Sequence, residues 1–310
     1  MKQWRSASFA AVLLAAAICA GSTPPGAAAN IGCGTSLVGE ITLAVLRNAP
    51  IVTLQANGSP VTLLLDTGAE TTILTPAAAQ RIGAQPPRVE FSRQMHGLSG
   101  SLGTSEAELR SFTAGHVLFP WRRIRVASIN MPRVFAGSLD GVLGTDTLNS
   151  FDIDLDFPHH RLGFYSRQSC PEAAPAWSAP YARIAAGRSL NGQLRFPVQL
   201  DGRSIDAFID SGAQLTVLAT RAAMALGVTH AALARDRPTM ASGAAAERLD
   251  SHAHRFSRLE IAGEIVRQPE IIVADINLTG IDLILGIDFL ISREIWLSYG
   301  SQQIFLSRRL

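Results

Sequence analysis

Two aspartates in matching surroundings are the residues of this 310-residue chain whose types and spacing best suit catalysis. Asp66 follows the apolar run Leu63-Leu64-Leu65, and Asp210 follows a second apolar run. Each run predicts a buried strand that ends in a tight loop. The loop residues are Thr67, Gly68 and Ala69 in the first copy and Ser211, Gly212 and Ala213 in the second. A lone ionised carboxylate beside a core is costly, so another group must share its charge.

The aspartates belong to an internal repeat that spans most of the chain. Asp66 and Asp210 are 210 − 66 = 144 positions apart. The same spacing separates Asn57-Gly58 from Asp201-Gly202, Thr72 from Thr216, and Leu74 from Leu218. The later segments Val142-Leu143-Gly144 and Ile284-Leu285-Gly286 are 142 positions apart. A single Asp-Thr/Ser-Gly segment is common by chance, whereas two in a matched repeat predict two similar lobes.

Strand-like patterns dominate both halves. Asn57-Gly58 and Asp201-Gly202 each separate two apolar-rich segments, which is a strong hairpin signal. One short helix is expected after each aspartate loop, in residues 77–82 and 220–226, because each segment ends at a glycine and Thr75 can cap the first. We therefore predict an all-β fold of two β-barrel lobes related by a pseudo-two-fold axis, with one short helix in each lobe.

Such an axis would place Asp66 opposite Asp210. Two carboxylates at such a short distance share one proton, and the pKa of one of them rises. One carboxylate can then act as general base on a water molecule while the other donates its proton to a substrate carbonyl. Gly68 and Gly212 would let the loops approach, and the hydroxyls of the neighbouring Thr67 and Ser211 could bond across to the other lobe. This chemistry needs no metal, cofactor or covalent nucleophile.

The residues of both loops resemble a known family. Asp66-Thr67-Gly68-Ala69-Glu70-Thr71-Thr72-Ile73-Leu74 closely resembles the active-site segment of retroviral-type (retropepsin-like) aspartic proteases, and Asp210-Ser211-Gly212-Ala213-Gln214-Leu215-Thr216-Val217-Leu218 is similar to it. The apolar-apolar-Gly segments 142–144 and 284–286 look like that family's second signature, which packs beneath the aspartate loop. The resemblance covers nearly all of residues 45–310 and implies a hydrolase of peptide or protein substrates.

The retroviral enzymes are homodimers with one aspartate per chain, whereas this chain resembles a fused pair. The resemblance therefore implies a molecule that is active as a monomer. Ala69 and Ala213 stand where pepsin-like enzymes usually have Ser or Thr, which favours the retroviral type.

A Gly/Ser-rich segment in the first half is interpreted as a flap, a mobile cover that needs glycine for backbone freedom. Its residues are Met95, His96, Gly97, Leu98, Ser99 and Gly100. The corresponding segment of the second half, 240–244, is shorter, so we expect only the first to be the working flap.

The N-terminus has the order of a secretory signal peptide: Lys2 and Arg5, an apolar run over 9–20, then small residues up to Ala29. The run is too short to span a membrane comfortably. Cleavage is expected after Ala29, with Ala20 as the alternative, and it would leave an exported protein, periplasmic or secreted, without a stable membrane span. A lipid anchor at Cys19 is not favoured, because Ile18 is bulkier than the residue that usually precedes a lipid-modified cysteine.

The remaining chain divides at a Pro/Ala/Ser-rich segment. We expect a signal peptide at 1–29, an N-terminal extension at 30–44, a first protease lobe at 45–167, a linker at 168–190 and a second lobe at 191–310. Cys33 and Cys170 lie just outside the first lobe and are candidates for a disulfide in an oxidising compartment, although both could also be free.

Composition excludes several other functions. The formal net charge of +2 and the absence of a basic run give no support to nucleic-acid binding. The pairs His159-His160 and His252/His254 are interpreted as surface-loop residues, because no cysteine or acidic cluster completes a metal site. Asp146 and Asp288 recur in register and are interpreted as hydrogen-bonded loop carboxylates. The alternative to an enzyme is a two-lobed envelope protein that binds peptides without cutting them, although such a protein would not need both complete loops.

Overall fold

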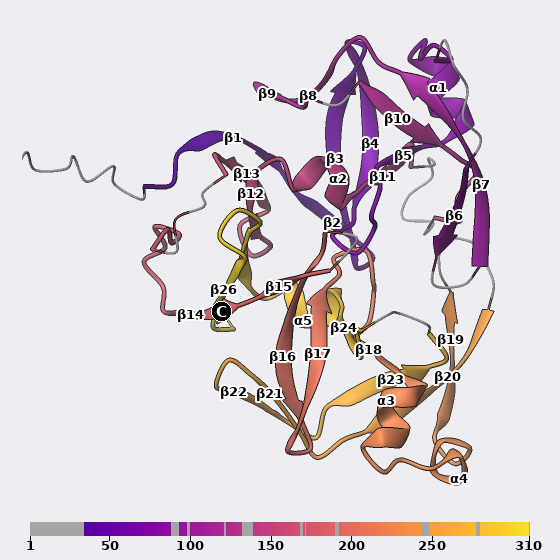
Figure 1. Ribbon diagram of the computed structural model, residues 1–310, viewed down its shortest axis with the longest axis vertical. Helices are drawn as coiled ribbons and strands as arrows, with labels where there is room; N and C mark the ends of the chain where they lie inside the picture. The colour runs from indigo at the N-terminus through magenta and orange to yellow at the C-terminus, as the bar shows by residue number, and fades with distance from the viewer. Residues whose placement is uncertain are drawn as a thin grey trace, which may run out of the picture. The chain divides into compact units, whose positions relative to one another are not determined.

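The computed structural model describes residues 34–87, 93–97, 100–120, 122–131, 139–167, 170, 172–189, 192–242, 248–276 and 280–309. These residues lie in one compact unit, Cys33–Leu310. The predicted signal peptide, 1–29, lies outside the described residues. Strands dominate the described chain, and they form two similar lobes with a six-stranded sheet between them (Figure 1). The predicted all-β, two-lobed fold is therefore confirmed.

Each lobe contains a ten-stranded sheet. The first lobe has β2 (Ala44–Leu46), β3 (Ala49–Ala56), β4 (Ser59–Leu65), β5 (Ile73–Leu74), β6 (Arg93–Gly97), β7 (Gly100–Glu108), β8 (Phe112–Ala114), β9 (Val117–Leu118), β10 (Arg123–Val126) and β11 (Gly141–Leu143). The second has β15 (Gly187–Arg188), β16 (Leu194–Leu200), β17 (Arg203–Ile209), β18 (Val217–Ala219), β19 (Arg237–Ser242), β20 (Arg248–Arg255), β21 (Arg258–Ile261), β22 (Glu264–Arg267), β23 (Glu270–Ala274) and β24 (Leu283–Leu285).

The two lobe sheets have the same strand order. It runs β6-β7-β10-β5-β11-β4-β3-β8-β9 in the first and β19-β20-β23-β18-β24-β17-β16-β21-β22 in the second. In each lobe the strand that leads to the aspartate pairs in parallel with the strand of the apolar-apolar-Gly segment, β4 with β11 and β17 with β24. This pairing explains why the sequence repeat keeps both segments, since each positions the other.

The hairpins predicted at Asn57-Gly58 and Asp201-Gly202 are confirmed. Ala56 pairs with Ser59, and Leu200 with Arg203, so each loop has two residues. All four loop residues have positive φ, between 49° and 79°. That is the backbone of a type I′ turn, in which asparagine, aspartate and glycine are tolerated best.

The two predicted helices are present as α1 (Pro76–Arg81) and α3 (Thr220–Ala225). Thr75 caps α1, because its side chain accepts from the backbone N–H of Ala78 at 3.2 Å. The described residues contain three further four-residue helices, α2 (Thr145–Leu148), α4 (His230–Leu233) and α5 (Ile287–Leu290). One turn of helix leaves almost no periodic pattern in a sequence, so one helix per lobe was an underestimate.

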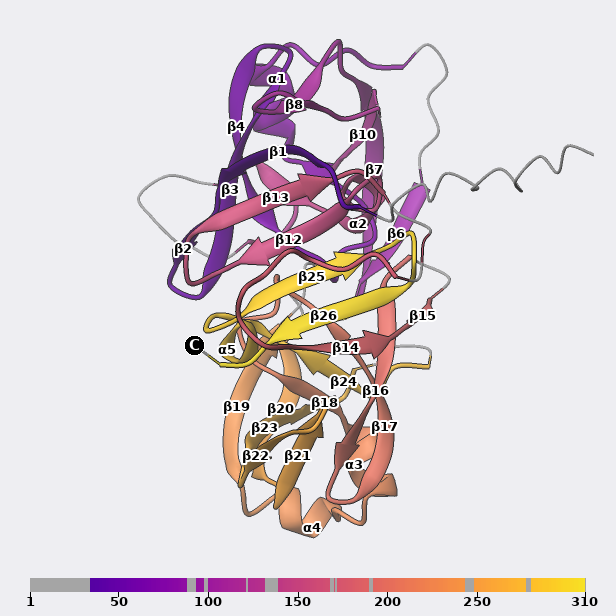
Figure 2. The ribbon, with the colours of Figure 1, turned by 90° about the vertical axis from the view of Figure 1, so that its left-hand side faces the viewer.

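The six-stranded sheet joins the lobes (Figure 2). Its order is β1 (Leu37–Thr42), β13 (Arg161–Tyr165), β12 (Asp152–Asp156), β25 (Glu294–Ser298), β26 (Gln303–Ser307) and β14 (Tyr181–Ala185). The last two strands of each half form an antiparallel hairpin, β12 with β13 and β25 with β26, and the two hairpins meet where β12 pairs with β25.

The edge strands of this sheet extend the repeat. β1 pairs with β13, and β14 pairs with β26. The first residues of β1 and β14 are 181 − 37 = 144 positions apart, the same spacing as the two aspartates. The segments interpreted as an N-terminal extension and a linker therefore contain equivalent strands.

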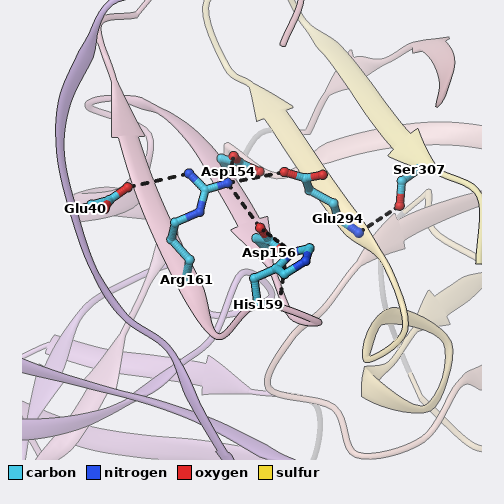
Figure 3. A network of polar contacts seen from close by, with 7 residues as sticks. All are labelled: Glu40, Asp154, Asp156, His159, Arg161, Glu294 and Ser307. Carbon is cyan, nitrogen blue, oxygen red and sulfur yellow. Dashed lines mark hydrogen bonds and ion pairs between the residues drawn. The ribbon is translucent and has the colours of Figure 1, made fainter. Parts of the chain in front are cut away.

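One face of this sheet carries a network of acidic groups around Arg161, in which Asp154, Asp156 and Glu294 are buried and Glu40 is exposed (Figure 3). Its guanidinium contacts Asp154 at 3.1 Å and Glu294 at 3.3 Å, and it reaches Glu40 at 3.6 Å. Asp156 lies 3.1 Å from Arg161 and also contacts His159. The carboxylates come from β1, β12 and β25, so the network spans the boundary between the lobes.

Within the described part of the chain, no helix is both long and apolar enough to cross a membrane.

Candidate functional site

Asp66 and Asp210 stand at equivalent strand ends, one in each lobe. Asp66 follows β4, and its N–H donates to Leu143 O of the parallel neighbour β11 at 3.1 Å. Asp210 follows β17, and its N–H donates to Leu285 O at 3.0 Å. The last residue of each apolar run is therefore held in a sheet, and the aspartate is the first residue to leave it.

The residue after each aspartate fastens the two loops together. The Thr67 hydroxyl accepts from Ser211 N at 3.0 Å and donates to Ile209 O at 2.8 Å. The Ser211 hydroxyl accepts from Thr67 N at 3.1 Å and donates to Leu65 O at 2.7 Å. Both side chains are buried, so these four bonds are shielded from competing water. The hydrogen bonds that the sequence predicts between the Thr67 and Ser211 hydroxyls and the opposite lobe are therefore present.

Glycine is required at the next position because the opposite carboxyl group occupies the space of a side chain. A Cβ on Gly68 would overlap with the Asp210 carboxyl, and a Cβ on Gly212 would overlap with that of Asp66. The two overlaps are reciprocal. They show that each carboxyl packs against the other loop and that the two aspartates face each other across the boundary between the lobes.

Each carboxylate is oriented by its own loop. Asp66 Oδ1 accepts from the N–H groups of Gly68 and Ala69 at 2.9 and 2.8 Å. Asp210 Oδ1 accepts from those of Gly212 and Ala213 at 2.8 and 3.1 Å. In both cases Oδ1 points into the loop, so Oδ2 is the oxygen without a loop donor.

Both carboxyl groups of the pair have a raised pKa. Burial raises the pKa of Asp66, and the N–H of Ala69, a hydrogen bond with Asp210 and the N–H of Gly68 oppose that rise. Burial and the charge of Asp66 raise the pKa of Asp210 well above its usual range. The pair can therefore hold one proton at a pH where two isolated carboxylates would hold none.

A second layer of bonds supports each loop from below. Asp146 Oδ1 accepts from the backbone N–H and the hydroxyl of Thr72, at 2.8 and 2.7 Å. In the second lobe the Thr216 hydroxyl donates to Asp288 at 2.9 Å. The predicted hydrogen bonding of Asp146 and Asp288 is confirmed, but their assignment to loops was wrong, because they lie in the first turns of α2 and α5.

Two donors to the first loop were not found by sequence reasoning. Gln193 Nε2 donates to Gly68 O at 2.7 Å, and Thr145 Oγ1 donates to Thr67 O at 3.0 Å. Gln193 belongs to no motif. However, its position in the other half is Ala49, because 193 − 144 = 49. A comparison of the two halves for polar residues without a polar counterpart could have found it.

Both lobes carry a flap-like hairpin. β6 and β7 pair from Arg93↔Thr104 to Gly97↔Gly100, which includes four of the predicted flap residues, Met95, His96, Gly97 and Gly100. Leu98 and Ser99 lie outside the described residues. β19 and β20 form the equivalent hairpin, with six paired positions against five. The second Gly/Ser-rich segment is shorter in sequence, but its hairpin is not, because backbone pairing does not require glycine.

Other predicted residues lie away from this site. His252 and His254 are in β20, so their assignment to a surface loop was wrong, and each contacts an aspartate, Asp250 or Asp236. Cys170 is disulfide-bonded, and its partner lies outside the described residues, so pairing with Cys33 stays a prediction. Among the residues that the structure describes, no cluster of His, Cys, Asp or Glu is arranged to hold a metal ion.

The site and fold can now be compared with known proteins. A family model described as "Aspartyl protease" matches residues 52–147 and 196–289, one match in each lobe. Among solved structures, the chain is similar to the aspartic proteinase from Irpex lacteus, with a TM-score of 0.51 and 16% sequence identity over 87% of this chain and 97% of that one. No curated protein is similar enough in sequence to count as a match. Each family match contains one of the facing Asp-Thr/Ser-Gly-Ala loops and the apolar-apolar-Gly strand beside it, and together they show that the chain belongs to the aspartyl protease family.

Proposed function

We propose that this protein is an exported aspartic endopeptidase that hydrolyses peptide bonds with Asp66 and Asp210. The observation that carries the proposal is the pair of reciprocal glycine–carboxyl contacts, which brings two carboxyl groups with raised pKa values face to face. A pair that shares one proton contains both a base and an acid, which is what the addition of water to a peptide carbonyl needs.

In the proposed reaction, the ionised carboxylate removes a proton from a water molecule held between the two aspartates. The water oxygen forms a bond to the peptide carbonyl carbon while the protonated carboxyl gives its proton to the carbonyl oxygen. The tetrahedral intermediate then breaks at its C–N bond. The leaving nitrogen takes a proton from one carboxyl group of the dyad, and a hydroxyl of the intermediate gives its proton to the other as the new carboxyl product forms, so the dyad again holds one proton. The substrate is a peptide or protein, and no metal, cofactor or covalent enzyme intermediate takes part.

Thr67, Ser211, Gly68 and Gly212 keep the dyad in place through the inter-lobe bonds and contacts described above. Ala69 and Ala213 contribute backbone N–H groups rather than side-chain donors. The hairpin of β6 and β7, with Met95 to Gly100, would cover bound substrate. Because both aspartates belong to one chain, the proposed active unit is a monomer.

Export is proposed from the sequence of residues 1–29 alone, and it places the mature protein in the periplasm or outside the cell. The alternative function is a protein of the same fold that binds peptides without cutting them.

The test compares cleavage of a peptide library by the purified mature protein, the variants Asp66→Asn and Asp210→Asn, and the control Asp201→Asn. Asp201 is exposed in the β16–β17 turn, about 23 Å from Asp210 along a seven-residue strand. Mass spectrometry across pH 3–7 should find cleavage by the wild type and by Asp201→Asn, and a loss of at least about 10²–10⁴-fold in the two dyad variants.

Equal activity in Asp66→Asn and the wild type would rule out the dyad mechanism. Specific binding of peptides without cleavage at any pH would favour the alternative. Specific activity that falls steeply on dilution would contradict a monomeric active unit.

A further inference from the structure

The first aspartate loop has two side-chain donors that the second loop lacks. Gln193 Nε2 donates to the carbonyl of Gly68, and the Thr145 hydroxyl donates to the carbonyl of Thr67. Both donors are buried, with 8% and 0% of their surface exposed. The bonds therefore lie where water does not weaken them.

The equivalent positions of the second lobe cannot make these bonds. Gln193 corresponds to Ala49, because both are seven residues before the last residue of the equivalent strands β16 and β3. Thr145 corresponds to Ile287, since each follows the glycine of the apolar-apolar-Gly segment. Within the described residues, no side chain donates to the carbonyl of Ser211 or Gly212.

Gln193 is held in the orientation that this bond requires. Its Oε1 accepts from the Ser189 hydroxyl at 2.9 Å, and the same hydroxyl accepts from Gln193 N at 3.1 Å. With Oε1 occupied by a donor, Nε2 is the end of the amide that faces Gly68.

The two carbonyls belong to the peptide groups whose N–H bonds point at Asp66. The Thr67 carbonyl shares a peptide plane with Gly68 N–H, and the Gly68 carbonyl shares one with Ala69 N–H. Those two N–H groups are the donors to Asp66 Oδ1. A donor on the carbonyl polarises the peptide and strengthens its N–H as a donor. Both peptides that orient Asp66 are polarised in this way.

We propose that Gln193 and Thr145 are positioning residues that select Asp66 as the ionised member of the dyad and leave the shared proton on Asp210. The proposal deepens the proposed function, on which its catalytic meaning rests. It assigns the base to Asp66 and the acid to Asp210. In an exact homodimer the two loops would be identical, so this selection depends on the divergence of the two halves.

The other charged groups near the loop do not replace this explanation. Asp210 is the titratable group that acts on the pKa of Asp66, and it acts on both tautomers of the pair. Burial raises the pKa of Tyr299 above its ordinary value, while Arg188 and Asp152 act on Tyr299 with opposite signs. Tyr299 thus stays neutral and adds no charge to this region.

The test is a titration of the aspartate Cγ carbons by ¹³C NMR, with the two dyad signals assigned from Asp66→Asn and Asp210→Asn. Gln193→Met and Thr145→Val remove a donor while nearly keeping the shape of the side chain. Thr145→Ser is the matched control, because it keeps the hydroxyl. In the wild type, the lower macroscopic step should appear mainly on Asp66.

Polarisation strengthens a hydrogen bond by about 10–30%, which for a charge-assisted bond corresponds to about 0.3 pKa unit per donor removed. Gln193→Met and Thr145→Val should each raise the pKa of the lower titration step by about that amount, and the double variant should raise it by about twice as much. Thr145→Ser should leave it within about 0.1 unit. The acid limb of the kcat/KM profile should move by the same shift, whereas a residue that only stabilised the loop would lower kcat at every pH without moving the limb.

The proposal would be overturned if the lower macroscopic titration step appeared mainly on Asp210. It would also be overturned if neither Gln193→Met nor Thr145→Val changed the pKa of that step. If Thr145→Val loses its near-ultraviolet circular dichroism and is therefore misfolded, the titration of Gln193→Met alone tests the proposal. If the wild type cleaves no peptide but its lower step follows the expected pattern, the proposed function fails while the assignment of the ionised aspartate holds.

Discussion

Stability between pH 5 and pH 8 should depend on the acidic network of the six-stranded sheet, and Glu294→Gln tests this directly. Burial and the neighbouring charges of Asp154 and Asp156 raise the pKa of Glu294 to about 7. Burial raises that of Asp154 to about 6, although Arg161 opposes the rise. One arginine does not neutralise this many carboxylates, so the folded protein holds protons that the unfolded chain releases.

The sign follows from the raised pKa values. Well below pH 3.8 both carboxyl groups are protonated in both states and the network is not penalised. Stability is then lost as pH rises through the folded values near 6 and 7, because ionisation in the folded state costs more than in the unfolded chain. For buried Asp154, the shift from 3.8 to about 6 corresponds to about 3 kcal/mol. For Glu294, whose carboxylate lies nearer to solvent, we discount the shift to about 1–2 kcal/mol.

Glu294→Gln is neutral at every pH and close in shape to the protonated side chain. At pH 5 its free energy of unfolding should match the wild type within about 0.5 kcal/mol, and at pH 8 it should exceed the wild type by about 1–2 kcal/mol. Urea unfolding, followed by tryptophan fluorescence at both pH values, measures this difference. The comparison cancels the contributions of the dyad and of titrating groups outside this network.

The control is Glu270→Gln, an exposed carboxylate on β23 whose ion pairs with Arg237 and Arg255 are also exposed. Such pairs contribute little, so the difference from wild type should be nearly the same at both pH values. A Glu294→Gln variant that is less stable than wild type at pH 8 would refute the reasoning, and so would a wild type that gains stability from pH 5 to pH 8.

The dyad leads to three further predictions. Gly68→Ala should abolish cleavage and destabilise the protein by about 1–3 kcal/mol in thermal unfolding, because its Cβ overlaps with the Asp210 carboxyl; wild-type activity in this variant would contradict the packing of the loops. Asp210→Asn should be inactive yet more stable than the wild type at pH 7. Because the folded-state pKa of Asp210 is raised, the wild type loses stability as pH increases, whereas the asparagine variant does not ionise. A chemical denaturation curve without this gain in stability would count against the raised pKa. Ala69→Ser with Ala213→Ser should move the pH–rate profile to lower pH, because each hydroxyl can donate to a charged carboxylate; a profile that stays in place or moves upward would exclude that bond.

Local sequence patterns predicted the parts of the fold that neighbouring residues decide. The turns at Asn57-Gly58 and Asp201-Gly202 were predictable because positive φ strongly restricts the residue types. The cap at Thr75 was predictable for a similar reason, since its hydroxyl bonds only three residues ahead. The facing aspartates required one further step, the comparison of the two halves.

The parts that could not be predicted depend on contacts between distant segments. β12 and β25 carry no signal that they pair, because strand propensity does not name the partner strand. Segments 30–44 and 168–190 contain the edge strands β1 and β14, whose partner strands β13 and β26 lie far along the chain. Gln193 was missed because its role comes from a carbonyl 125 positions earlier in the chain.

The central pairing of β12 with β25 has a consequence for the order in which the molecule forms. β12 begins at Asp152 and β25 at Glu294, so 142 further residues must be synthesised before the first half finds its neighbour in the sheet. At about 5–20 residues per second, this takes roughly 7–28 s. During that time β12 presents an unpaired strand edge, which is a template for pairing with other chains. The first half of the molecule therefore depends on its own second half, or on a factor that covers the edge, to avoid aggregation while the chain is being completed.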